Sequence, residues 1–233
     1  MAIADASLLG RLAPRFFDWF KTSENVAAMH QKHIESETVV HMMKGTPFAT
    51  APDTAKLDFA RSTVGAAVVS FMQLEQQYIG DWKVQRIVEA AGADFDAAGA
   101  RLALSDHIAS APVVIFSFVD CPWCLLAKEA LLDELSLAQG ETSGDLLRVI
   151  ELEDLGRMGK SLRAAIALAT GRTSMPAIFV GGRAIGGYTD GEPVGDTELC
   201  WSDSPGLERL VEQGALKEML QQAGVKFDQH LRL

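Results

Sequence analysis

The segment VVIFSFVDCPWCLLAKEALL, residues 113–132, constrains the fold of this chain more than any other. The β-branched and aromatic run at 113–118 predicts a short buried strand. Apolar residues at helical spacing over 124–137 predict a helix. Cys121 and Cys124 lie where the strand passes into the helix. The segment therefore predicts an α/β fold that presents two thiols at the start of a helix.

The spacing of these cysteines indicates redox chemistry. The first N–H groups of a helix and its dipole favour a thiolate, so we expect the pKa of Cys121 to be lowered. Cys124 follows after one turn, close enough to form an intramolecular disulfide, and Pro122 stiffens the link between them. Two other interpretations are open, namely half of a zinc site and two ordinary helix cysteines. A zinc site usually needs four ligands, and Cys200 is the chain's one other cysteine.

The elements around this segment alternate between helix and strand. From residue 97 on, the predicted order is helix, strand, helix, strand, helix, strand, strand, helix. The predicted ranges are 98–110, 113–118, 124–137, 147–152, 158–170, two strands within 176–187 around Gly181-Gly182, and a helical stretch that opens at Ser204-Pro205 and breaks at Gly214. The first two strands are joined through a helix and should be parallel, whereas the hairpin must be antiparallel.

The first 96 residues read differently, because they carry helical periodicity and no strand-like alternation. Helices are predicted at 4–20, 24–43, 54–78 and 82–91, with breaks at Pro14 and at the proline-containing stretch 46–53. We predict a helical N-terminal domain over 1–96 and a second domain over 97–233. The helical part would dock a protein partner, form a dimer contact, or pack on the second domain.

A stripe of polar residues lies on one face of the predicted helix at 24–43. His30, His33, Glu37 and His41 fall on this face at helical spacing. Such a stripe can bind zinc or copper or respond to pH. The plainer interpretation is a solvated helix surface.

Composition excludes several classes of partner. The chain has 233 residues, is 48% hydrophobic and carries a net charge of −10, which disfavours nucleic acid and anionic lipid surfaces. It has no apolar run long enough for a membrane span, and its start lacks the pattern of a secretory signal. Three cysteines are too few for a disulfide-stapled secreted domain. We predict a cytoplasmic protein, with an organelle such as a plastid or mitochondrion as the alternative.

Two segments together resemble the dithiol glutaredoxins. They are VVIFSFVDCPWCLLAKEALL and TSMPAIFVGGRAIGGYTD. That family has a strand, then C-P-[YWF]-C, then T-V-P with a cis proline, then a hairpin and G-G-x-x-D. The resemblance covers about residues 97–226. It implies a thioredoxin-like domain with a mixed four-stranded sheet, here preceded by an all-α N-terminal domain.

The resemblance also assigns roles to residues. Cys121 matches the attacking cysteine, which takes the glutathionyl group from a mixed disulfide, and Cys124 matches the resolving cysteine. Met175 would offer its backbone N–H and C=O to the cysteine part of glutathione, beside a cis Pro176. The residues that the resemblance implies at the glutathione site are Trp123, Arg163, Ser174, Met175, Pro176, Gly187, Tyr188, Thr189 and Asp190. Of these, Thr189 and Asp190 would hold the γ-glutamyl end.

Two departures from the family pattern stand out. Phe118 replaces the lysine that usually contacts the glycine carboxylate of glutathione and helps to hold the thiolate. Our hypothesis is that Arg163, or else Arg172, supplies the missing cation; the alternative is a solvated surface arginine. The second departure is the insert at 191–204, which carries Cys200. It would form a flap, a partner surface or a plain loop, and Cys200 would be either a regulatory or an idle thiol.

The predicted function is that of a glutathione-dependent thiol–disulfide oxidoreductase. It would reduce protein–glutathione mixed disulfides and protein disulfides, as part of electron transport in cellular redox homeostasis. Glutathione would be the co-substrate, the partners would be proteins with glutathionylated or disulfide-bonded cysteines, and no metal is expected. The alternatives are a thioredoxin-like reductase that does not use glutathione and a glutathione-dependent iron–sulfur carrier. Pro122 disfavours the carrier, because such glutaredoxins usually have Gly or Ser there.

Overall fold

A mixed four-stranded sheet lies at the centre of the protein. In a computed structural model, the structure describes residues 6–24, 26, 51–138, 143–191 and 198–227. The strands are β1 (Val113–Ser117), β2 (Leu147–Glu151), β3 (Ala177–Val180) and β4 (Arg183–Gly186), in the order β2-β1-β3-β4. β1 pairs in parallel with β2, and β3 pairs antiparallel with both β1 and β4. The predicted parallel pair and antiparallel hairpin are therefore confirmed.

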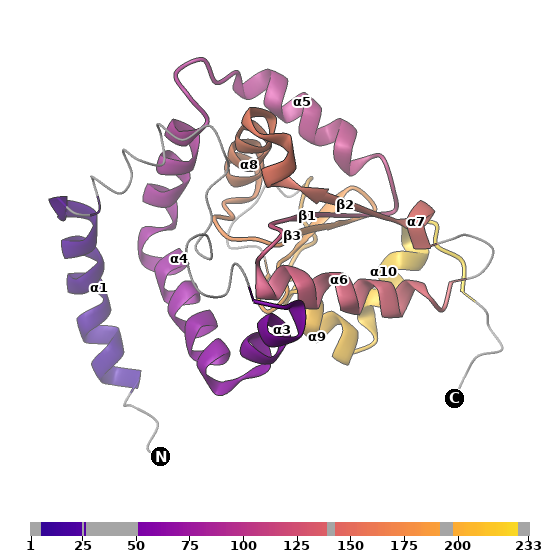
Figure 1. Ribbon diagram of the computed structural model, residues 1–233, viewed down its shortest axis with the longest axis horizontal. Helices are drawn as coiled ribbons and strands as arrows, with labels where there is room; N and C mark the ends of the chain where they lie inside the picture. The colour runs from indigo at the N-terminus through magenta and orange to yellow at the C-terminus, as the bar shows by residue number, and fades with distance from the viewer. Residues whose placement is uncertain (1–5, 25, 27–50, 139–142, 192–197, 228–233) are drawn as a thin grey trace.

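Helices cover both faces of the sheet (Figure 1). One face carries α5 (Ala97–Ile108) and α8 (Arg157–Thr170), and the other carries α6 (Pro122–Leu135), α9 (Leu207–Glu212) and α10 (Ala215–Gln222). Side chains of β1 alternate between the two layers, with Val114 and Phe116 on the α8 side and Val113 and Ile115 on the α6 side. Both layers exclude solvent from β1, which explains why its sequence is apolar throughout. The short helices α7 (Ser143–Leu146) and η2 (Leu152–Leu155) flank β2.

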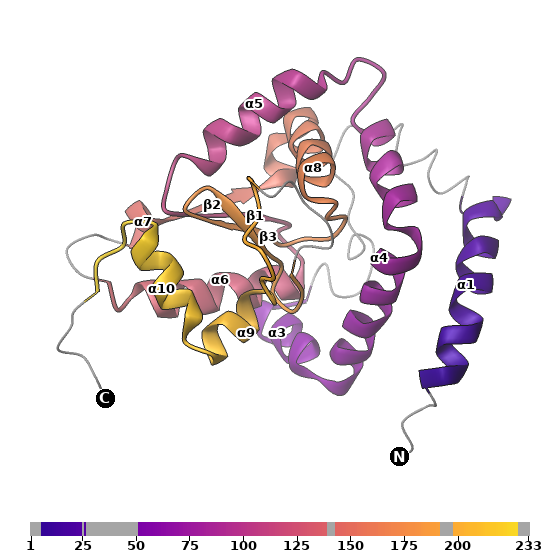
Figure 2. The ribbon, with the colours of Figure 1, turned by 180° about the vertical axis from the view of Figure 1, so that it is seen from behind.

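In the described residues before this domain lie the helices α1 (Ala6–Thr22), α3 (Asp53–Arg61) and α4 (Thr63–Ala90). Figure 2 shows α4 running past the end of the sheet, with α1 on its outer side. α3 packs against α6, and α4 packs against α8, where Ile87 and Ala91 meet Ala164 and Ala167. Helices α3 and α4 therefore share buried apolar surface with the sheet domain. The division at residue 96 stays a prediction.

The structure corrects the predicted helices at two places, Pro14 and Ser62. Pro14 lies inside α1 instead of breaking it, because burial of Ala13 and Phe17 against Ile79 of α4 holds the helix together despite one lost hydrogen bond. An additional break falls at Ser62, inside the stretch that was predicted as one helix at 54–78. Ser62 caps α4 by accepting a hydrogen bond from the Gly65 N–H at 3.1 Å. α4 then continues to Ala90 with a kink at Ile79, whose backbone angles are non-helical (φ −135°, ψ 15°). This kink confirms the predicted interruption between residues 78 and 82.

Two further helical predictions concern the break at Gly214 and the helix at 24–43. The break at Gly214 is confirmed, because this glycine takes a left-handed conformation with φ 69° between α9 and α10. The predicted helix at 24–43, with its stripe of histidines, lies outside the described residues apart from positions 24 and 26. Among the helices that the structure describes, none combines the length and apolarity needed to cross a membrane.

The described end of the insert lies along the edge of the sheet. The Ala184 N–H of β4 donates to the Leu199 carbonyl at 2.7 Å, and the Trp201 N–H donates to the Ala184 carbonyl at 2.9 Å. The Arg183 guanidinium lies over the Trp201 ring and donates to the Cys200 carbonyl at 2.7 Å. Cys200 itself is buried as a free thiol. The segment 199–201 therefore extends the sheet beyond β4.

Candidate active site

The two cysteines occupy the start of α6. Cys121 is the N-cap residue, with extended backbone angles, and Pro122 is the first residue of the helix. Proline suits this position because the first N–H groups of a helix have no partner within the helix. Both thiols are free, and the exposed fraction is 7% for Cys121 and 0% for Cys124. The predicted strand-to-helix junction is confirmed, and Cys121 is the more accessible sulfur.

The two thiols differ in acidity. A hydrogen bond from Cys124 is the largest cause that lowers the pKa of Cys121, aided by the backbone N–H groups of Cys124 and Trp123 and by the charge of Lys128. Burial opposes this shift but does not outweigh it. Burial and the neighbouring Cys121 raise the pKa of Cys124 well above its ordinary value. Cys121 is therefore the more acidic thiol and the better candidate for the attacking thiolate, and Cys124 is the less acidic of the two.

Replacing Cys124 tests this coupling. In Cys124→Ala the hydrogen bond to the thiolate is lost, so we expect the pKa of Cys121 to rise. The rate of iodoacetamide alkylation follows the thiolate fraction, so its midpoint should move to higher pH. Cys200→Ala is the control, because Cys200 has no role in this hydrogen bond, and its midpoint should match that of the wild type. A Cys124→Ala midpoint equal to the wild-type value would contradict the assignment.

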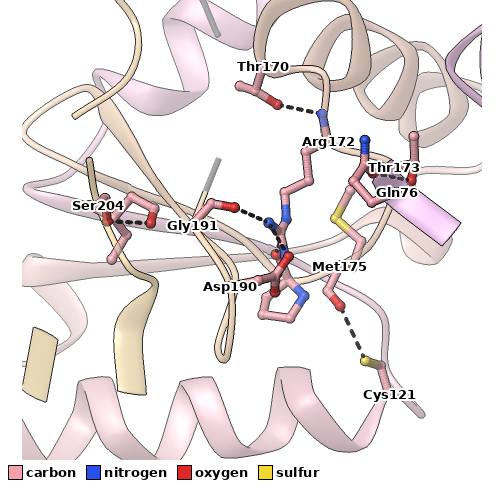
Figure 3. A network of polar contacts seen from close by, with 11 residues as sticks. Gln76, Cys121, Thr170, Arg172, Thr173, Met175, Asp190, Gly191 and Ser204 are labelled. Atoms are coloured by element: carbon pink, nitrogen blue, oxygen red, sulfur yellow. Dashed lines mark hydrogen bonds and ion pairs between the residues drawn. The ribbon is translucent and has the colours of Figure 1, made fainter. Parts of the chain in front are cut away.

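A second segment faces the cysteines. The peptide bond between Met175 and Pro176 is cis, as the resemblance implies. The Met175 carbonyl oxygen lies 3.8 Å from the Cys121 sulfur, and the two are joined by a dashed line in Figure 3. The Met175 side chain is buried, so its backbone is what borders the sulfur. This geometry places a peptide edge beside the reactive thiol.

Arg172, which is buried, and Asp190, which is partly exposed, form a clamp behind that edge (Figure 3). The Arg172 side chain is 2% exposed, and two of its N–H groups bond the two Asp190 carboxylate oxygens, each at 3.1 Å. The same guanidinium donates to the carbonyls of Pro176 at 2.9 Å and Gly191 at 3.3 Å. Gly187 is required nearby, because a Cβ there would overlap the guanidinium. Arg172 thus fixes the position of the Asp190 carboxylate. This pairing was not predicted from the sequence.

A groove beside Cys121 brings together most of the predicted glutathione-site residues. The predicted residues that line it are Trp123, Ser174, Met175, Pro176, Tyr188, Thr189 and Asp190. Gly187 adjoins them through its hydrogen bond to the Asp190 carbonyl at 2.7 Å. The opposite wall comes from α4, which sequence reasoning had not connected with the site.

Arg163 is set apart from this lining. Its guanidinium carbon lies 5.3 Å from the centre of the Phe118 ring, and it donates to the Thr173 carbonyl at 3.5 Å. Burial lowers the pKa of Arg163 to about 10, so the side chain is charged at neutral pH. A cation therefore lies against the ring that replaces the family lysine, but it does not border the groove.

Helix α3 holds the loop that carries Cys121. The Lys56 ammonium donates to Asp120, directly before Cys121, at 2.9 Å, and to Asp53 at 3.3 Å. Burial lowers the pKa of Lys56, but the two carboxylates outweigh it and raise the pKa above its ordinary value. The pair therefore contributes stability throughout the neutral range, and this is lost only as the pH rises through the raised pKa. Phe59 also meets Trp123 edge-to-face, with ring centres 6.0 Å apart.

Loss of the Lys56 charge should loosen the active-site loop. We expect Lys56→Met to lower the free energy of unfolding by about 1 kcal/mol, because Asp120 loses a charged hydrogen-bond donor. The bare Asp120 carboxylate beside Cys121 should also raise the pKa of that thiol. Urea unfolding and alkylation against pH would measure both effects. Adding Asp120→Asn should restore the alkylation midpoint; a midpoint that Lys56→Met leaves unchanged would argue against the contact.

Within the described ranges, no group of three or more His, Cys, Asp and Glu side chains is arranged to hold a metal ion. No protein-family model matches the chain.

Comparison with known proteins shows that the chain is similar to glutaredoxins. Glutaredoxin-C6 of Oryza sativa subsp. japonica is 36% identical over 85 residues, which cover 36% of this chain and 67% of that protein. A glutaredoxin of Ricinus communis is 38% identical over 80 residues, which cover 34% of this chain and 69% of that protein. Among solved structures, a buckwheat glutaredoxin–glutathione complex is 27% identical, with 58% of this chain and 99% of that chain covered and a TM-score of 0.42. Through its relatives, the chain belongs to the glutaredoxin family of redox proteins.

Proposed function

We propose that the protein is a glutathione-dependent thiol–disulfide oxidoreductase that acts on protein–glutathione mixed disulfides and on protein disulfides. One observation carries the proposal: the sulfur of Cys121, the more acidic thiol, lies 3.8 Å from the carbonyl oxygen of Met175, and Met175 lines a groove together with Arg172 and Asp190. The family membership supports the redox class of the reaction. Glutathione is the co-substrate in this proposal, and the clients are proteins with glutathionylated or disulfide-bonded cysteines.

The monothiol reaction needs Cys121 alone. Its thiolate attacks the glutathione sulfur of a mixed disulfide, a Cys121–glutathione disulfide forms, and the client leaves as a thiolate that takes a proton from water. A second glutathione thiolate then attacks the bound glutathione sulfur. Oxidised glutathione leaves, and Cys121 returns to its thiolate form. The net exchange consumes one glutathione thiol, returns the client thiol, and carries the client's glutathionyl group away in oxidised glutathione.

The dithiol reaction also uses Cys124. Cys121 attacks a client disulfide and forms a mixed disulfide, which removes the negative charge that had raised the pKa of Cys124. The Cys124 thiol then loses its proton and attacks the Cys121 sulfur. The client leaves with both thiols reduced, and the internal disulfide is reduced in turn by two glutathione molecules.

The groove residues have proposed roles in holding glutathione. The Met175 backbone would pair with the cysteine part of the tripeptide, as an added strand does. Asp190 would accept from the α-ammonium, and Thr189 would donate to the α-carboxylate. Two of the four lone-pair positions of Asp190 are used by Arg172, so the carboxylate still has capacity for a ligand. Arg163 as the missing cation stays a prediction from the sequence.

The compartment we propose is the reducing cytoplasm, with the plastid as the alternative. A rice relative, 37% identical over 83 residues that cover 55% of its length, carries the name Glutaredoxin-C4, chloroplastic. Localisation of the tagged full-length protein would decide between the two.

A pair of assays tests the proposed function. The first follows reduction of a glutathionylated peptide by glutathione, coupled to glutathione reductase. The second follows insulin reduction fed by thioredoxin reductase. We expect turnover in the first assay and little in the second. Turnover only in the second assay would replace glutathione by thioredoxin reductase as the electron source and overturn the proposal.

A further inference from the structure

Helix α4 forms the wall of the groove that faces the active-site elements. Its lining side chains include Met72, Gln76 and Lys83, across from Trp123 and Met175. The family resemblance begins near residue 97, so this wall belongs to the part of the chain that precedes it. A ligand in the groove would therefore contact residues from both parts of the chain.

Gln76 fixes this wall in place. Its side-chain carbonyl accepts from the Thr173 hydroxyl at 2.7 Å, and its amide N–H donates to the Gly171 carbonyl at 3.0 Å. Figure 3 shows Gln76 next to Thr173, beside the segment that leads to Met175. Gly80, one turn later, leaves room for the Gln76 amide, because a Cβ there would overlap it. α4 is thus held in register with the residues that border the reactive thiol.

Two cations line the groove among the described residues, Arg172 and Lys83. The Arg172 guanidinium is committed to Asp190 and to the carbonyls of Pro176 and Gly191. The Lys83 ammonium has three N–H groups, and the structure gives one of them to Glu75, at 2.7 Å. The Lys83 side chain is 20% exposed, so an incoming anion can reach it. Lys83 is therefore the groove cation with donor capacity for a ligand.

The direction of the ligand follows from the proposed function, on which this inference rests. The γ-glutamyl end lies at Asp190 and the cysteine part pairs with Met175. The glycine end then continues past Met175 toward Thr173, to which Gln76 of α4 is bonded. A carboxylate that arrives there needs a positive partner, and Phe118 does not supply one. Arg163 bonds the Thr173 carbonyl and lies over the Phe118 ring, but it does not line the groove.

We propose that Lys83 binds the glycine carboxylate of glutathione. It takes over the carboxylate-binding role of the lysine that is absent at Phe118, and it does so from a helix outside the glutaredoxin-like part of the chain. Glu75, which also lines the groove, holds the ammonium at this wall through one N–H group, and the other two N–H groups are the donors for the ligand. The N-terminal helices are then a component of the substrate site.

Lys83→Met tests the proposal. We expect the KM for glutathione to rise about tenfold, because the ligand loses one charge-assisted hydrogen bond. A tenfold change corresponds to about 1.4 kcal/mol of binding free energy. The kcat and the alkylation midpoint of Cys121 should stay close to wild type, because Lys83 does not touch the sulfur. Arg86→Met is the matched control, since it removes a cation from the same helix but outside the groove lining. An unchanged KM in Lys83→Met would overturn the proposal.

Glutathione glycine monoethyl ester identifies the carboxylate. The wild type should show a KM for the ester about tenfold above that for glutathione, whereas Lys83→Met should not distinguish the two. A Lys83→Met enzyme that still prefers glutathione by the wild-type factor would refute the contact. Lys83→Gln replaces the methionine variant if the latter does not fold. A wild type without glutathione turnover would instead refute the proposed function, so the two failures are distinguishable.

Discussion

Cys121→Ser should reduce glutathione-dependent turnover to the uncatalysed rate. A serine hydroxyl does not ionise near neutral pH, so neither the monothiol nor the dithiol reaction has a nucleophile. Cys124→Ser should behave differently. It keeps the thiolate at position 121, so we expect it to reduce glutathionylated peptides but to lose its activity on protein disulfides. The glutathione-coupled assay with both kinds of substrate measures this separation.

The control for this pair is Cys200→Ser, which removes the third buried thiol of the described residues. It should keep both activities, because Cys200 lies beside β4 and away from the groove lining. An active Cys121→Ser would overturn the mechanism, and a Cys124→Ser without deglutathionylation would show that the second thiol is needed for the first step.

Arg172→Met should lower the free energy of unfolding by about 2 kcal/mol, because a buried, charged hydrogen-bond donor is lost and its acceptors are left without a partner. The change strips Asp190 of its two hydrogen bonds and removes the donor to the Pro176 and Gly191 carbonyls. Since Asp190 is the proposed ligand of the α-ammonium, the KM for glutathione should also rise. Urea unfolding and the coupled assay measure the two effects.

Arg157→Met provides the comparison for stability. Arg157 pairs with Asp94 at 2.8 Å, and the two side chains are 77% and 70% exposed. Such a pair contributes at most about 1 kcal/mol. If both variants shift the urea midpoint equally, burial of the Arg172 clamp has no special weight.

The centre of the fold follows from local sequence patterns. The run at 113–118 is apolar because β1 is covered on both faces, and its place before Cys121 indicates the strand-to-helix junction. Gly181-Gly182 predicts the hairpin because both residues take positive φ in the turn between β3 and β4. These features depend on neighbours in the sequence, which periodicity and turn chemistry detect.

Contacts between distant parts of the chain were not predicted from the sequence. Lys56 reaches Asp120 across 64 positions, and Gln76 reaches Thr173 across 97. On a helix these residues look like ordinary surface positions, since no local pattern distinguishes a lysine that pairs with solvent from one that pairs with an active-site loop. The clamp of Arg172 and Asp190 was missed for the same reason, although each residue was named separately as a candidate.

The segment Leu199–Trp201 affects whether other polypeptides can add to the edge of the sheet. Disulfide reductases meet clients that are partly unfolded, and an open sheet edge invites such chains to add a strand and to aggregate. Here both main-chain groups of Ala184 are already occupied by Leu199 and Trp201. At this point of β4, the segment Leu199–Trp201 therefore blocks the addition of a strand from another chain.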